Sequence, residues 1–119
     1  MINAGLRRSK FRMGFVLDGE DRDYIAKRGL PQISLHARDF IRRRLASRDP
    51  KNDGKQTPFQ GHPVFKAQHA TATCCRGCLE KWYGIRKGRP LSAKEIETVL
   101  GTIMEWIQSK LEIKRGGSK

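Results

Sequence analysis

All three cysteines of the chain lie within five residues, in the run Cys74-Cys75-Arg76-Gly77-Cys78. Cysteine thiolates and histidine nitrogens are the usual ligands of a structural zinc ion, which takes four of them in a tetrahedron. Cys75 and Cys78 have the C-x2-C spacing that lets two thiolates converge on one ion, and His69 lies six residues before Cys75. The segment therefore predicts a metal site, with Zn2+ as the expected ion.

The fourth ligand is the open point of this hypothesis. No Cys or His follows Cys78, so the remaining ligands must come from upstream. His62 is the preferred choice, although two turns of helix, about 10 Å, would separate it from His69 unless the segment bends. Cys74 and His36 are the alternative fourth ligands. We expect the side chain of Cys74 to diverge from that of Cys75, and His36 would have to come from the preceding arginine-rich helix.

Three other interpretations of the cysteines stay open. A zinc ion with three protein ligands and a water would make the protein a metal-dependent enzyme, with Glu80 or Asp39 as general base. Cys75 and Cys78 could instead form a redox-active dithiol, although no β-α-β pattern surrounds them. The cysteines could also be plain buried residues. The sequence leaves open whether there is any catalytic activity.

The net charge of +13 points to a polyanionic partner. Such an excess attracts nucleic acid in a salt-dependent way, and an anionic membrane surface is the second choice. The alternative is a charged coat that only keeps the protein in solution. The residues we expect to contact nucleic acid are Arg38, Arg42, Arg43, Lys81, Arg86, Lys87 and Arg89.

Periodicity and capping signals predict a mainly α fold. Residues 20–28 should form a helix, and the apolar positions between Ile33 and Leu45 define one face of a longer one. Shorter helices are expected at 62–70 and 79–83. Ser92 and Glu95 form a capping box that starts the last long helix. We expect two long amphipathic helices packed around the Cys/His metal-binding segment.

The length of 119 residues predicts one small domain. Residues 1–16 should be a basic arm or a short N-terminal strand, because apolar residues alternate between Phe11 and Leu17. A single compact domain should cover 17–113, followed by a disordered basic tail at 114–119. No apolar run approaches the roughly 18 residues of a membrane span, and no signal peptide is visible, so a soluble cytoplasmic protein is expected. The sequence does not indicate the oligomeric state.

The central block also resembles a known family. The segments 54–58, 61–65 and 67–82, together with Trp106-Ile107, are similar to small microbial proteins filed as domain of unknown function 4186. The resemblance extends from His36 to Trp106. It implies a single compact domain, and the family name implies no activity.

Overall fold

Six helices make up most of residues 9–117, the part of the chain described by this computed structural model, with side chains described as far as Glu112. They are α2 (Lys10–Met13), α3 (Gly19–Arg28), α4 (Leu30–Arg44), α5 (Pro63–Thr71), α6 (Arg76–Tyr83) and α7 (Ala93–Gly117). No strand occurs among these residues, which confirms a mainly α fold. Within the same range, no helix is both long and apolar enough to cross a bilayer.

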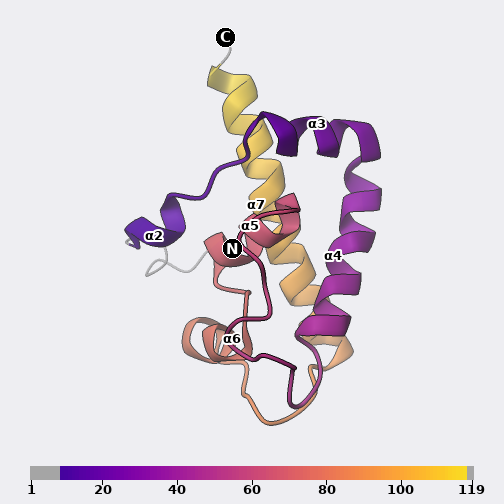
Figure 1. Ribbon diagram of the computed structural model, residues 1–119, viewed down its shortest axis with the longest axis vertical. Helices are drawn as coiled ribbons and strands as arrows, with labels where there is room; N and C mark the ends of the chain where they lie inside the picture. Colours follow the sequence, from indigo (N-terminus) through magenta and orange to yellow (C-terminus); the bar gives the residue numbers. More distant parts are fainter. Residues whose placement is uncertain (1–8, 118–119) are drawn as a thin grey trace.

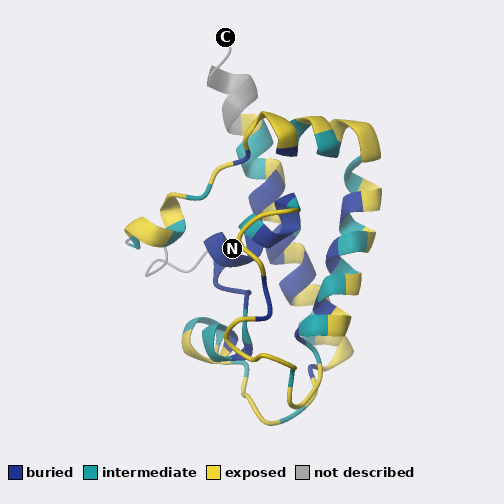
Figure 2. Ribbon diagram, viewed as in Figure 1, coloured by how far each residue is buried: buried dark blue, intermediate teal, exposed yellow. Residues whose placement is uncertain are grey.

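The two longest helices, α4 and α7, pack against each other, and α5 packs on both (Figure 1). Ile33, Ala37 and Ile41 are fully buried on one face of α4, as their spacing of four residues predicts. Ile103 and Ile107 of α7 belong to the same apolar cluster. Figure 2 shows that burial is concentrated on α5 and the stretch of α7 beside it. The predicted arrangement of two long amphipathic helices around the Cys/His segment is confirmed.

Polar caps set the helix boundaries. Asp18 and Asp21 form a capping box at the start of α3, in which Asp18 Oδ1 accepts from the Asp21 N–H at 2.9 Å. Ser92 and Glu95 form the predicted box at α7. Gly29 has a φ of +84°, which favours glycine, and it turns the chain from α3 into α4. Most helix starts were therefore predictable from local chemistry.

The N-terminal arm contains a helix where the sequence suggested a short strand. Its residues Lys10–Met13 form one helical turn, α2, in which the Ser9 hydroxyl accepts a hydrogen bond from the Arg12 N–H. A strand needs a neighbour to pair its backbone, and the described part of the chain offers none. Burial of Leu17 and packing of α2 on α5 hold the arm instead.

The two ends of the chain bear on the predicted domain boundaries. Residues 1–8 of the predicted basic arm lie outside the described residues. At the other end, α7 continues to Gly117, into the segment predicted as a disordered tail, and residues 118–119 again lie outside. The boundaries at 17 and 113 stay predictions.

Candidate metal centre

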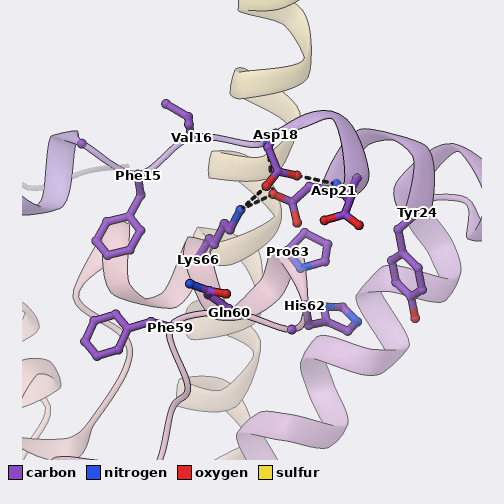
Figure 3. Close-up of a pocket in the computed structure, with 13 residues that line it drawn as sticks. Phe15, Val16, Asp18, Asp21, Tyr24, Phe59, Gln60, His62, Pro63 and Lys66 are labelled. Carbon is purple, nitrogen blue, oxygen red and sulfur yellow. Dashed lines mark hydrogen bonds and ion pairs between the residues drawn. The ribbon is translucent and has the colours of Figure 1, made fainter.

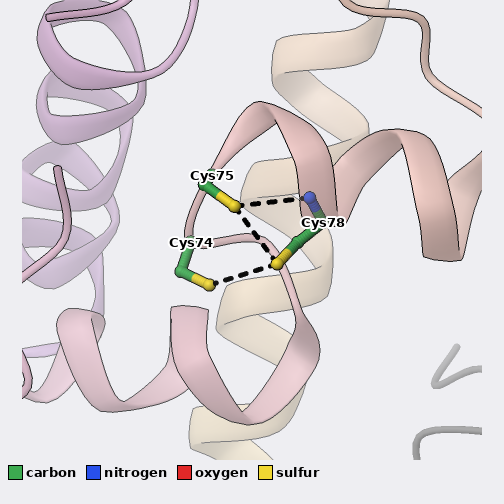
Figure 4. Close-up of side chains that lie close together, drawn as sticks. All are labelled: Cys74, Cys75 and Cys78. Atoms are coloured by element: carbon green, nitrogen blue, oxygen red, sulfur yellow. Dashed lines mark hydrogen bonds between the residues drawn. The ribbon is translucent and has the colours of Figure 1, made fainter. Parts of the chain in front are cut away.

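The three cysteine sulfurs converge at the N-terminus of α6 (Figure 4). Their Sγ atoms lie within 4.8 Å of one another, with 3.2 Å between Cys75 and Cys78 and 3.7 Å between Cys74 and Cys78. All three are free thiols. We expected Cys74 to diverge, but its sulfur joins the cluster. Within the described range, these cysteines are the one group of three or more Cys, His, Asp or Glu side chains placed to hold a metal ion.

The backbone between α5 and α6 brings these sulfurs together. Ala72 ends α5 with a left-handed φ of 59°. Cys75 then caps α6, and its Sγ accepts from the Cys78 N–H at 3.3 Å, which places Cys78 one turn away on the same side. Gly77 is an ordinary helical residue, where an added Cβ would meet the Cys75 sulfur at 3.9 Å, a normal contact. The C-x2-C spacing therefore works through the geometry of a helix start, and no glycine turn is needed.

Hydrogen bonds within the cluster favour a thiolate at Cys75. Its pKa is lowered to about 2, chiefly through side-chain hydrogen bonds with Cys74 and then Cys78, assisted by the Cys78 backbone N–H. The pKa of Cys74 is raised, because its thiol is a donor in these hydrogen bonds and is buried. Cys75 is thus the cysteine of the cluster that loses its proton most readily, and the thiolate is the form that binds metal.

His69 lies on α5, buried beside two aromatic rings. Phe15 and Phe59 stack on its imidazole with centroid distances of 5.7 and 4.1 Å. Its Nε2 lies 3.0 Å from the carbonyl oxygen of Thr57 and 3.2 Å from that of Pro58. Carbonyl oxygens only accept, so Nε2 carries the proton and Nδ1 keeps the lone pair. Burial lowers the pKa of His69, which keeps the ring neutral.

Two residues that the sequence did not single out connect His69 to the cluster. Thr57 accepts from His69 through its carbonyl and donates its hydroxyl to the Cys74 carbonyl oxygen at 2.8 Å. Arg12 of α2 donates from Nη1 to the His69 carbonyl oxygen and from Nη2 to Cys78 Sγ, the latter at 3.4 Å. No local spacing could have indicated these contacts, because the Arg12 partners lie 57 and 66 residues away in the sequence.

His62 and His36 are paired with each other, away from the sulfurs. His62 Nδ1 accepts from the Val64 N–H at 3.0 Å, so the neutral ring carries its proton on Nε2. That nitrogen lies 3.0 Å from His36 Nδ1. Burial, together with the neighbouring His36, lowers the pKa of His62 to about 4. Both nitrogens of His62 are engaged, and neither His62 nor His69 belongs to the group formed by the three cysteine sulfurs.

Arg76, which separates the cysteines in sequence, is a buried structural residue with 1% of its surface exposed. Its two Nη atoms donate to four backbone carbonyl oxygens, at 2.8 to 3.3 Å. The acceptors are the carbonyls of Leu45, Ser47, Arg86 and Arg89. Arg76 therefore ties the segment after α4 and the segment before α7 to the start of α6.

A hollow of about 740 Å³ opens beside the start of α3 (Figure 3). Its main charged groups pair with one another, since Lys66 Nζ lies 3.1 Å from Asp18 Oδ2 and 2.5 Å from Asp21 Oδ2. The same two carboxylates cap α3. The charged residues of the hollow therefore join α3 to α5. We assign no reaction to this hollow.

Four of the seven cations expected to contact nucleic acid pair with carboxylates. The pairs are Arg38–Glu97, Arg43–Asp39, Lys87–Asp53 and Arg89–Glu95. Arg42 and Arg86 are exposed, and Lys81 Nζ lies 5.2 Å from the centre of the Trp82 ring. Within the described residues, no carboxylate pairs with these three cations.

A helical domain that gathers three thiols in this way defines a small protein able to hold a metal ion through cysteine. The chain belongs to the family described as domain of unknown function (DUF4186), whose model matches residues 1–108. This match confirms the resemblance seen in the central block. No solved structure matches the chain.

Proposed function

We propose that this protein holds one zinc ion in a closed structural site formed by Cys74, Cys75, Cys78 and His69. The convergence of the three Sγ atoms is the observation that carries the proposal. In a tetrahedral site with Zn–S bonds of about 2.3 Å, neighbouring sulfurs lie about 3.8 Å apart. The 3.7 Å between Cys74 and Cys78 fits this edge, and the 3.2 Å between Cys75 and Cys78 requires a small side-chain rotation.

His69 is favoured as the fourth ligand by the hydrogen bonds of its other nitrogen. A metal-bound histidine almost always donates its second ring N–H to a carboxylate, a backbone carbonyl or water, which orients the ring. His69 makes this contact through Nε2, and one guanidinium group touches both its carbonyl and Cys78 Sγ. His62, the ligand preferred from sequence, has no free ring nitrogen.

A closed site would stabilise the fold, because metal-binding free energy becomes folding free energy when the site forms only in the folded chain. The enzyme alternative needs a general base beside the metal. Glu80 Oε2 accepts from the Lys87 N–H, and Asp39 pairs with Arg43 on α4. Both carboxylates are thus engaged by other partners, so a structural role is favoured.

Titration of the reduced, metal-free protein with Co2+ tests the ligand set. Cobalt substitutes for zinc in tetrahedral sites, and its thiolate charge-transfer absorption scales with the number of bound sulfurs. We expect one Co2+ per chain with a tetrahedral spectrum, and a loss of about one third of the charge-transfer intensity in Cys74→Ser. An octahedral spectrum, or equal intensity in Cys74→Ser, would overturn the proposed ligands.

The redox alternative makes a different prediction from the same cysteines. Cys75 caps a helix, and its sulfur lies 3.2 Å from that of Cys78, as a dithiol pair requires. That alternative predicts a reversible Cys75–Cys78 disulfide in protein that holds little metal. Alkylation and mass analysis before and after reduction distinguish the two, since a zinc-loaded chain should be alkylated only after the metal is removed.

We also propose that the basic surface binds nucleic acid, in a cytoplasmic setting that keeps the thiols reduced. Arg42 and Arg86 add exposed charge, and the whole chain carries +13. These features favour contact with phosphates.

Fluorescence anisotropy with labelled single-stranded and duplex DNA and RNA tests this second proposal. We expect affinity to fall linearly with salt on a log–log plot, and Arg42→Gln with Arg86→Gln to reduce the slope by about one each. Arg38→Gln is the matched control, because Arg38 already pairs with Glu97. An affinity that is unchanged by salt and by both the Arg42→Gln and Arg86→Gln substitutions would reject the proposal.

A further inference from the structure

Arg12 reaches from the N-terminal arm to the cysteine cluster. Its guanidinium Nη2 lies 3.4 Å from Cys78 Sγ, and Nη1 donates to the His69 carbonyl oxygen. The side chain is half-buried, and in the described part of the chain no carboxylate lies within ion-pair distance of it. Cys78 Sγ is therefore the group in contact with Arg12 that can carry a negative charge opposite the guanidinium.

A charge count explains why a cation at this position matters. Three thiolates, one divalent zinc ion and one neutral imidazole carry a net charge of minus one. A net charge in a partly buried site is costly unless an opposite charge compensates it. A guanidinium that donates to a thiolate sulfur supplies that charge, and hydrogen bonds to ionised acceptors are about twice as strong as neutral ones.

The helix that carries Arg12 has few other attachments. α2 consists of four residues and buries none of them. Phe11 and Met13 are 57% and 49% exposed, so apolar burial contributes little to holding α2 in place. The Phe11 ring contacts the rings of Phe15 and Phe59, at centroid distances of 5.2 and 6.3 Å. Docking of α2 therefore depends strongly on the two Arg12 hydrogen bonds.

We propose that Arg12 is a positioning residue of the metal centre, which neutralises the loaded site and anchors α2 to it. The inference rests on the proposed function, because the charge to be neutralised is that of the zinc–thiolate group. It makes docking of the N-terminal arm dependent on the metal. Removing the metal weakens the Arg12 contact with Cys78 and releases α2.

Zinc affinity, measured by competition with a chromophoric chelator, tests the neutralising role. Arg12→Gln should bind zinc about 10-fold more weakly or worse, the usual effect of removing an outer-shell partner. Lys10→Gln is the matched control, because it removes the same charge from the same helix without touching the sulfur, and it should stay within about twofold through screening. Arg12→Lys should fall between them, since an ammonium group keeps the charge but lacks the planar fork.

Hydrogen exchange in the arm tests the anchoring role. The amides of Met13 and Gly14 donate to the Ser9 and Lys10 carbonyls in α2. Their protection should be present with zinc, lost with chelator, and lost in Arg12→Gln even with zinc bound. If Arg12→Gln binds one zinc with unchanged affinity and protection, this inference is wrong and the metal site stands. If the unaltered protein binds no zinc, the proposed function itself fails.

Discussion

His69 and Thr57 are joined by a hydrogen bond of 3.0 Å from the imidazole Nε2 to the Thr57 carbonyl oxygen. The Thr57 hydroxyl also donates to the carbonyl oxygen of Cys74. Thr57, in the long segment between α4 and α5, thus orients the His69 imidazole and also holds the backbone at Cys74. This arrangement leaves Nδ1 as the only unprotonated nitrogen of His69, which makes the role of this residue testable.

Replacement of His69 by Gln should weaken zinc binding by about 100-fold, because one of four ligands contributes roughly a quarter of the binding free energy of a structural site. His36→Gln is the matched control, since His36 contacts His62 and not the sulfurs. Chelator competition measures both, with circular dichroism to check that the helices persist. Equal affinity in the two variants would remove His69 from the ligand set.

Arg76→Met should lower the free energy of unfolding by about 3 kcal/mol or more, because four buried carbonyl oxygens lose their donors. Arg86→Met alters an exposed arginine and should change it by no more than about 0.5 kcal/mol. Urea denaturation of both proteins in the metal-free state separates this effect from zinc binding. Similar unfolding midpoints would show that Arg76 does not join these segments in solution.

Stability should fall as the pH drops from about 6.5 towards 4, partly through His62. Its pKa is about 4 in the fold and 6.5 in the reference state, so in this range the unfolded chain binds a proton that the folded chain does not. The neutral His62 therefore stabilises the fold above pH 6.5, and this contribution is lost on acidification. We expect about 1–2 kcal/mol, after allowance for partial exposure.

His62→Asn isolates this effect, because asparagine also caps a helix but does not titrate. Urea denaturation between pH 4 and 7 should show a shallower pH dependence for His62→Asn than for the unaltered protein. Since burial also lowers the pKa of His69, part of the slope should remain. Identical slopes in the two proteins would contradict the assignment.

The helices were predictable because their signals are local. The capping box at Ser92 and the spacing of apolar residues in α4 act within a few residues, and each predicted helix was found. The strand suggested for the arm was wrong, because alternation over Phe11 to Leu17 cannot reveal whether a partner strand exists. Pairing of that kind depends on the rest of the fold.

In the candidate site, too, the features set by local spacing were predictable and those set by tertiary packing were not. The C-x2-C pair could be recognised from spacing alone, and the structure adds Cys74 to it. The contacts made by Arg12 and Thr57 span 12 to 66 residues of sequence, so they follow from tertiary packing. The cap that His62 Nδ1 provides to the first turn of α5 could not be read from its distance to His69 along the chain.

Metal content is the most direct test of the central claim. Protein purified under reducing conditions without added metal should contain about one zinc per chain by elemental analysis, because structural sites bind tightly enough to survive purification. Cys75→Ser, prepared in the same way, should lose most of this metal. Less than about 0.2 zinc or other metal per chain in the unaltered protein would contradict a structural metal site.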